Sequence, residues 1–297
     1  MIELLGISCN KIYYKKRGYR ERKNKRKELP FMSKKAIKKL NSLYGWGYLM
    51  ITAYLKARGQ TISYRGVYYF MREENIIGRK PEQSTYEFNH KKIQCDMPRL
   101  IFQTDFTNLW IEKSWVYVFK VIDIFNREIV ALKVSTFSGS ITSEEILRQL
   151  VKTCISFPIT LIMDNGSCYT ANSHKELAKG LNIRLQYTKA YTPEHNGVIE
   201  RSWKTDKYEG LASFILSHDN LPDIFREWGY FHNTQRPHST NNYKTPLQKL
   251  ENYLKEHPDM KIPINPLNIK PEKLTYMKVP IKTIENSPVF VNFHSQS

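Results

Sequence analysis

The sequence predicts an α/β core, with a mixed sheet flanked by helices, preceded by a small all-α region. Two observations carry this prediction. Up to about residue 80 apolar residues recur at helical spacing, whereas from about residue 100 strand-like segments come first in succession and then alternate with helical ones. The resulting order of three strands, helix, strand, helix, strand and two helices is typical of an α/β domain with a mixed sheet.

The N-terminal arm, residues 1–30, holds the densest positive charge. Residues 11–27 contain ten Lys and Arg and one acidic residue, and residues 1–99 carry +15 of the chain's net charge of +18. Such a run favours contact with phosphates, because each neutralised phosphate releases counterions. Candidate DNA contacts here are Arg20, Arg22 and Lys23. A solvated arm without a partner is the alternative.

Residues 31–80 are expected to form a helical domain with helices at 34–44, 46–58 and 64–76. Ser33 and Ser63 are the expected N-caps of the first and third helices, and Gly59 is expected to end the second. Two helices joined by a short glycine-containing turn suggest a helix-turn-helix-like DNA-binding domain, although any small helical bundle gives this pattern. Residues 81–98 are then expected to be a linker.

The core is expected at residues 99–255, with strands at 99–111, 114–125, 127–135, 158–163 and 183–188. Helices are expected at 142–156, 173–181, 197–216 and 221–233, with Thr142 or Ser143 as the N-cap of the first. The proline-rich tail, residues 256–297, is expected to add a small strand or no regular element.

Composition limits the function classes. Of the 297 residues 41% are hydrophobic, as in globular proteins, and 46 basic residues against 28 acidic ones favour a polyanionic partner such as nucleic acid. No run of about 18 uncharged apolar residues and no signal sequence is evident, so we expect a cytoplasmic protein without a membrane partner. The four cysteines are widely spaced, which argues against a disulfide framework and against zinc.

Three acidic residues stand out by position. Asp105 lies between apolar neighbours in the first predicted strand, where an unpaired carboxylate is costly to bury. Asp164 follows the fourth strand, at the end where open α/β sheets bind ligands. Glu200 lies in a long helix, with 35 residues between it and Asp164. Each alone has an ordinary structural interpretation, Asp164 as part of an Asp-Asn-Gly turn, yet together they could converge on divalent metal ions.

These residues and their surroundings resemble the DDE catalytic core of retroviral integrases and bacterial insertion-sequence transposases. The similar motifs are "TDFT", "DNGSCYT" and "TPEHNGVIERSWKTDK", which contain the three carboxylates in order, and "HNTQRPHSTNNYKTP" downstream. The segment "GWGYLMITAYLKARGQTISYRGVYYFMREENIIGR" resembles the helical DNA-binding part of the insertion-sequence branch. The resemblance covers roughly residues 4–250. Departures at Phe102, Ile162, Met163, His232 and Asn241 concern the subgroup and leave the carboxylates intact.

The resemblance implies a ribonuclease-H-like integrase core with a mixed five-stranded sheet. It also implies that Asp105, Asp164 and Glu200 are catalytic residues that bind two Mg²⁺ or Mn²⁺ ions. The expected activity is DNA strand cleavage by water, which frees a 3′-hydroxyl, and strand transfer by that hydroxyl to target DNA during transposition of a mobile element. Expected partners are element-end DNA, target DNA, further copies of the chain and an upstream-frame helix-turn-helix protein. The implied location is the nucleoid.

Further DNA contacts are expected near Glu200. Lys204 and Lys207 follow it on one helix face, where the alternative is a solvated surface. The loop before this helix supplies three more candidates: His195, Asn196 and Gly197. Arg236 and His238 are expected either to contact phosphate or to pack the turn at Pro237. A structural role is expected for Asp123.

Two other functions are compatible with parts of the sequence. A DNA-binding regulator descended from a transposase would use only residues 1–80, and would not need the three carboxylates. A stand-alone metal-dependent nuclease would use the carboxylates, but it would leave the basic front end and the "RPH" segment without a role.

Overall fold

The sheet has five strands in the order β3-β2-β1-β4-β5. The computed structural model describes residues 28–77, 93–154, 158–188 and 196–277. The strands are β1 (Ile101–Ile111), β2 (Ser114–Asp123), β3 (Ile129–Ser135), β4 (Ile159–Met163) and β5 (Ile183–Tyr187). β1 and β3 pair antiparallel with β2, whereas β4 pairs parallel with β1 and β5. The prediction of a mixed five-stranded sheet flanked by helices is confirmed.

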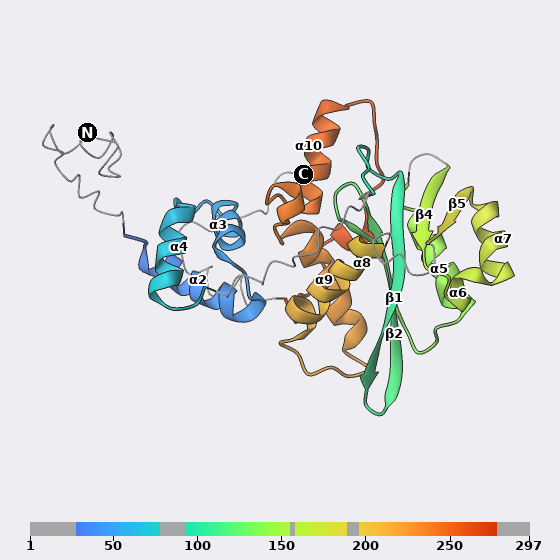
Figure 1. Ribbon diagram of the computed structural model, residues 1–297, viewed down its shortest axis with the longest axis horizontal. Coiled ribbons are helices and arrows are strands. Elements are labelled where there is room, and N and C mark those ends of the chain that lie inside the picture. The colour runs from blue at the N-terminus through green and yellow to red at the C-terminus, as the bar shows by residue number, and fades with distance from the viewer. Residues whose placement is uncertain (1–27, 78–92, 155–157, 189–195, 278–297) are drawn as a thin grey trace, which may run out of the picture.

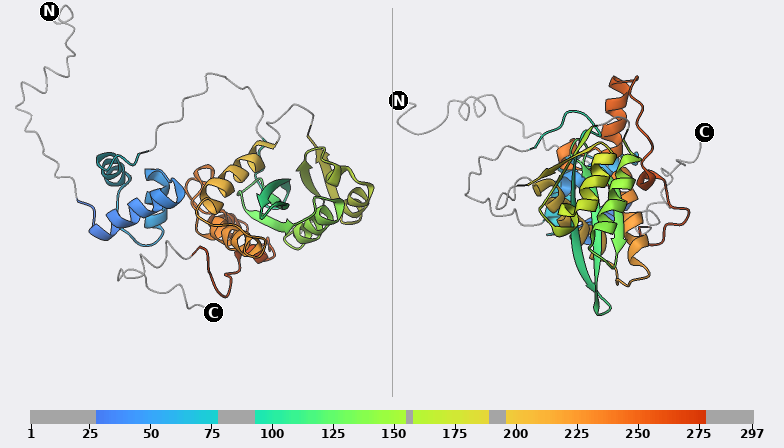
Figure 2. Two further views of the ribbon diagram at one scale, coloured as in Figure 1. Left: turned by 90° about the horizontal axis from the view of Figure 1, so that it is seen from below. Right: turned by 90° about the vertical axis from the view of Figure 1, so that its right-hand side faces the viewer.

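Helices cover both faces of this sheet (Figures 1 and 2). One face carries α5 (Ser140–Val151), α6 (Ser167–Thr170) and α7 (Asn172–Gly180). The other carries α8 (Gly197–Thr205) and α9 (Leu221–Thr234), and α10 (Pro246–Glu256) follows. A buried apolar cluster fills each interface, with Phe119 and Leu147 in the first and Val118 and Phe225 in the second. The sheet is therefore the middle layer of three.

The predicted all-α region is present as α2 (Phe31–Tyr44), α3 (Tyr48–Lys56) and α4 (Tyr64–Glu73). These helices lie on the side of α8 and α9 that faces away from the sheet (Figure 1). Their apolar core extends into α9, because Tyr44 and Trp46 stack on Phe231, with ring centroids 5.4 and 6.2 Å apart. The helical region and α9 thus share one hydrophobic core. The domain boundaries and the DNA-binding role of this region stay predictions.

Two of the predicted helix starts are wrong. Ser63 does cap α4, since its hydroxyl accepts from Gly66 N at 3.0 Å. Ser33 instead lies inside α2 and donates to Gln60 Oε1 at 2.8 Å. Thr142 and Ser143 lie inside α5, which begins at Ser140, and Ser143 Oγ donates to the Cys168 carbonyl at 3.0 Å. The Thr142 hydroxyl donates to the Phe137 carbonyl at 3.1 Å, and Ser143 Oγ also lies 2.8 Å from the Ser140 carbonyl. The hydroxyls that were expected to cap α2 and α5 therefore have other partners.

The long helix expected at 197–216 is interrupted. α8 ends at Thr205 and continues as a π-helix over Asp206–Leu211. Gly210 of this π-helix lies against Trp228 of α9, so closely that an added Cβ would be 2.7 Å from the indole ring. The wide π turn and a residue without a side chain together allow this close approach.

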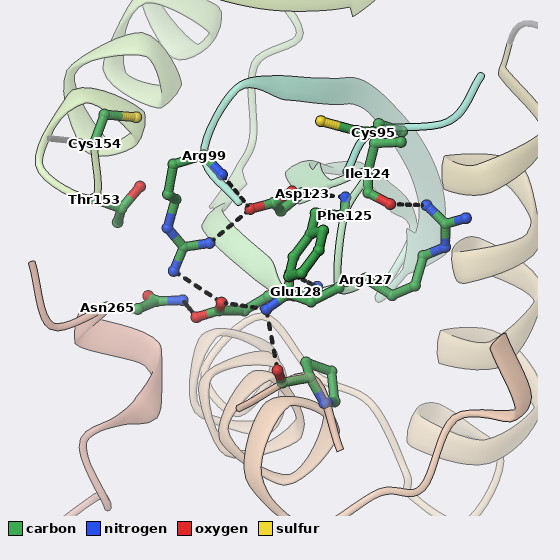
Figure 3. A network of polar contacts seen from close by, with 12 residues as sticks. Cys95, Arg99, Asp123, Ile124, Phe125, Arg127, Glu128, Thr153, Cys154 and Asn265 are labelled. Atoms are coloured by element: carbon green, nitrogen blue, oxygen red, sulfur yellow. Dashed lines mark hydrogen bonds and ion pairs between the residues drawn. The ribbon is translucent and has the colours of Figure 1, made fainter. Parts of the chain in front are cut away.

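A buried ionic network fixes the turn between β2 and β3 (Figure 3). Arg99 pairs with Asp123 at 3.0 Å and with Glu128 at 2.8 Å, and none of the three side chains is more than 2% exposed. Asn265 Nδ2 donates to Glu128 Oε1 at 2.7 Å, which ties the tail to the same network. The expected structural role of Asp123 agrees with these contacts.

The described part of the tail, residues 257–277, contains a short 3-10 turn at Pro266–Asn268. Backbone amides of Thr275, Tyr276 and Met277 donate to the buried Glu227 carboxylate. The tail therefore packs on α9 without adding a strand in the residues described. None of the helices in the described ranges is long and apolar enough to cross a membrane.

We predict that Arg99→Met lowers the free energy of unfolding by about 3–5 kcal/mol, because it leaves two buried carboxylates without a counterion. Urea unfolding followed by circular dichroism measures this. Lys38→Met is the matched control, since it breaks the exposed Lys38–Glu74 pair and should cost less than about 1 kcal/mol. Equal effects of the two substitutions would contradict the prediction.

Candidate active site

Asp105 and Asp164 lie on neighbouring strands in the middle of the sheet. β1 and β4 pair in parallel, with Gln103 opposite Ile162. Continuing this register by two residues brings Asp105 beside Asp164, which directly follows the last residue of β4. The register of the sheet thus brings together two of the three predicted carboxylates.

The electrostatics of Asp105 reflect this proximity. Burial, and next the charge of Asp164, raise the pKa of Asp105 to about 6. Two hydrogen bonds act in the opposite direction, from Phe106 N at 2.8 Å and from Trp203 Nε1 at 3.1 Å. A part-buried carboxylate that is repelled by a second one provides a favourable environment for a cation with a preference for oxygen ligands. The donors present fit Mg²⁺ or Mn²⁺.

Asp164 keeps its turn chemistry as well. Its Oδ1 accepts from Gly166 N at 2.9 Å, and Asn165 Nδ2 donates to the Thr188 carbonyl at 2.9 Å. These contacts fix the turn that follows β4, with the Asp164 side chain half-buried. The turn interpretation and the ligand interpretation are therefore compatible.

Glu200 lies exposed in the first turn of α8, the helix that packs beside Asp105. Ile199 N donates to Gln103 Oε1 on β1 at 3.1 Å, and the Trp203 indole reaches Asp105. Among the described residues, however, no three His, Cys, Asp or Glu side chains lie close enough to hold a metal ion. The structure brings two carboxylates together and keeps the third on the adjoining helix.

The predicted DNA contacts other than Arg236 and His238 fall into three groups. Lys204 and Lys207 are exposed, with Lys207 on the π-helix, where the wider turn changes the expected spacing of one helix face. Asn196 is half-buried and Gly197 is exposed at the start of α8. The remaining candidates, Arg20, Arg22, Lys23 and His195, lie outside the described residues.

Arg236 and His238 are buried, at 7% and 8% exposure. Arg236 makes a two-pronged ion pair with Glu209, from Nε at 2.7 Å and from Nη2 at 2.6 Å. Glu209 also accepts from Trp46 Nε1 at 2.6 Å. His238 Nε2 lies 3.3 Å from the His232 carbonyl. These contacts favour the packing alternative for both residues over phosphate contact.

A cavity of about 470 Å³ lies between α8 and the segment around Arg236. Gly197, Val198 and Arg201 line it from α8, and His232 and His238 line it from the other side. None of the three predicted catalytic carboxylates lines this cavity. It is therefore separate from the paired aspartates.

Sequence reasoning missed a second set of residues at the site. Lys120 on β2 is fully buried and is the cross-strand partner of Asp105. It pairs with Asp206, which also accepts from Trp228 Nε1 at 2.8 Å. The available signal was Lys120 itself, because a lysine within the apolar run "VYVFKVIDIF" requires a buried partner.

Comparison with known proteins identifies related sequences. Residues 96–193 and 181–246 each match a family described as an integrase core domain. A putative transposase InsD for insertion element IS2E of Escherichia coli is 31% identical over 100 residues, which are 32% of this chain and 44% of that protein. Transposase InsD for IS2A/D/F/H/I/K is also 31% identical, over 32% of each chain. The aligned segment spans less than half of these relatives.

Two solved structures are similar at low identity. One is a chain in the structure of a simian T-cell lymphotropic virus intasome in complex with PP2A regulatory subunit B56 gamma. The match covers 80% of this chain and 80% of that chain, with 16% identity and a TM-score of 0.47. The HTLV-2 integrase catalytic core domain in complex with magnesium covers 51% of this chain and 96% of that one, with 19% identity and a TM-score of 0.42.

We predict that Asp164→Asn, in metal-free buffer, lowers the pKa of Asp105 below 6 because it removes the neighbouring negative charge. The value should stay above the ordinary aspartate range, since burial persists. Carboxyl ¹³C NMR titration of labelled protein measures it. Asp219→Asn, at an exposed position, should leave the Asp105 titration unchanged. An unchanged pKa in Asp164→Asn would show that the two carboxylates do not interact.

Proposed function

The chain carries an integrase core domain over residues 96–246, and we propose on this premise that it is a DDE transposase. The proposed reaction is metal-dependent cleavage and strand transfer of DNA during transposition of a mobile element. The observation that carries the proposal is the pair Asp105 and Asp164 on adjacent strands, with the Glu200 helix packed against the same strand through Gln103 and Asp105.

In this proposal Asp105, Asp164 and Glu200 hold two Mg²⁺ or Mn²⁺ ions. Such ions, when bound, stabilise the charge that develops on the attacking and leaving oxygens of a phosphoryl transfer. Glu200 is exposed on α8, so its carboxylate is free to approach the aspartates when cations and DNA are present. The raised pKa of Asp105 supports a site that is completed by positive charge.

The proposed DNA contacts are the exposed amines of Lys204 and Lys207. Lys204 lies on α8 with Glu200, and Lys207 lies on the π-helix that continues α8. Asn196 and Gly197 lie at the start of α8. Among the described residues outside its own helix and its chain neighbours, no heavy atom lies within 4 Å of where a Gly197 Cβ would be. This open space allows a DNA backbone to come close to the helix start. The basic residues of the arm and the α2–α4 helices would bind element-end DNA through its phosphates.

The proposed partners are element-end DNA, target DNA, further copies of the chain and an upstream-frame protein, acting on chromosomal DNA in the cytoplasm. A regulator that uses only the helical region is less well supported, because it gives no role to the two part-buried carboxylates that lie side by side. A stand-alone nuclease is distinguished by strand joining, which only a transposase performs on defined duplex ends.

We predict that Asp105→Asn, Asp164→Asn and Glu200→Gln each abolish cleavage of an element-end duplex and spare DNA binding, because each removes a carboxylate ligand and leaves the basic surface intact. Gel-based cleavage and fluorescence anisotropy measure the two properties. Glu176→Gln, an exposed carboxylate on α7, is the matched control and should retain cleavage. Cleavage at the parent rate in any of the three variants would sink the assignment.

We also predict that Lys204→Gln combined with Lys207→Gln weakens DNA binding. The plot of the logarithm of the binding constant against the logarithm of the salt concentration should become less steep, by up to about 2, if each lysine neutralises one phosphate. Anisotropy titrations at several salt concentrations measure the slope. Lys175→Gln with Lys179→Gln makes the same charge change on α7, on the other face of the sheet. Identical slopes for the two double variants would argue against a DNA contact at α8.

A further inference from the structure

A lysine is buried directly behind the candidate active site. Lys120 is 0% exposed on β2, opposite Asp105 in the antiparallel register. Its ammonium donates to Ser202 Oγ at 2.8 Å and forms an ion pair with Asp206. Both partners belong to the continuous helical segment that starts with α8 and carries Glu200. Lys120 therefore connects the sheet to the helix at the level of Asp105.

Trp203 lies between this lysine and Asp105. The Lys120 ammonium is 3.7 Å from the centroid of the indole ring, a cation–π contact in a buried environment. The indole Nε1 donates to Asp105 Oδ2 at 3.1 Å, while Phe106 N donates to Oδ1 at 2.8 Å. Each carboxylate oxygen of Asp105 is thus held by one donor, and one of these donors comes from the Glu200 helix.

We propose that Trp203 and Lys120 are positioning residues for Asp105. The Trp203 indole fixes the orientation of the Asp105 carboxylate relative to Asp164, and Lys120 holds the indole in place through its ring face. This inference rests on the proposed function, because it takes Asp105 as a ligand of a divalent cation. Donors that orient a metal ligand typically change metal affinity or activity by about 10–100-fold when they are removed.

Trp203→Phe tests the indole N–H alone, since phenylalanine keeps an aromatic face for Lys120 and cannot donate. We expect Mn²⁺ binding to the metal-free full chain, measured by electron paramagnetic resonance of free Mn²⁺, to weaken by about 10-fold. Cleavage of the element-end duplex should fall in parallel. Trp46→Phe is the matched control, because it removes an indole N–H from a different carboxylate, that of Glu209 at 2.6 Å, and leaves the contacts of Asp105 and Lys120 untouched. Its Mn²⁺ affinity should equal that of the parent.

A second variant tests Lys120 without leaving a charge buried alone. Lys120→Met with Asp206→Asn removes both charges of the pair, a change that buried ion pairs often tolerate. We expect a folded protein by circular dichroism with weakened Mn²⁺ binding. If Trp203→Phe binds Mn²⁺ as the parent does, the indole contact is structural only and the inference is overturned. If only the double variant binds Mn²⁺ as the parent does, the role assigned to Lys120 is overturned.

Asp105→Asn distinguishes a failure of the proposed metal site from a failure of the positioning role. If it removes Mn²⁺ binding while Trp203→Phe keeps it, the positioning role fails and the proposed function stands. If Asp105→Asn itself binds Mn²⁺ with parent affinity, both the metal site and the positioning role fail.

Discussion

A charged side chain is costly to bury unless an opposite charge or hydrogen-bond partners compensate it, and this constraint organises the candidate active-site region. Lys120 on β2 meets it through Asp206, and Arg99 meets it through Asp123 and Glu128 near the end of the same strand. The first pair ties the sheet to the Glu200 helix, and the second ties it to the tail through Asn265. The sheet is thereby tied both to the helix that lies beside Asp105 and to the tail.

The sheet and most helices could be predicted from the sequence because their signal is local. Alternating and helical spacing of apolar residues gave five strands and the main helices within a few residues of their observed bounds. The expected caps at Ser33 and Ser143 failed because Gln60 and Cys168, which are distant in sequence, bind those hydroxyls. The π-helix also had no local signal, since its close packing involves Gly210 and Trp228 on different elements.

In the candidate site, too, some residues could be predicted from the sequence and others could not. The proximity of Asp105 and Asp164 was expected from the resemblance to the DDE catalytic core, whereas the strand register that produces it appears only in the structure. The supporting residues could not be predicted, since the Trp203 contact with Asp105 and the Trp46 contact with Glu209 join residues 98 and 163 positions apart. For the same reason the sequence left open whether Arg236 contacts phosphate or packs in the interior. Its partner Glu209, 27 positions earlier, is seen only in the structure.

The aromatic stack between the α2–α3 turn and α9 has an evolutionary consequence. Tyr44, Trp46 and Phe231 form one buried layer across what the sequence divides into two parts. Under the proposed function, α2–α4 bind DNA, and a mobile element could not exchange them as an independent module, because they complete the interior beside α9. A transplanted segment would have to present an aromatic surface that fits α9 and an N–H donor for Glu209. New sequence recognition in this lineage would therefore arise more readily by substitution on the outer faces of α2–α4 than by replacement of the whole segment.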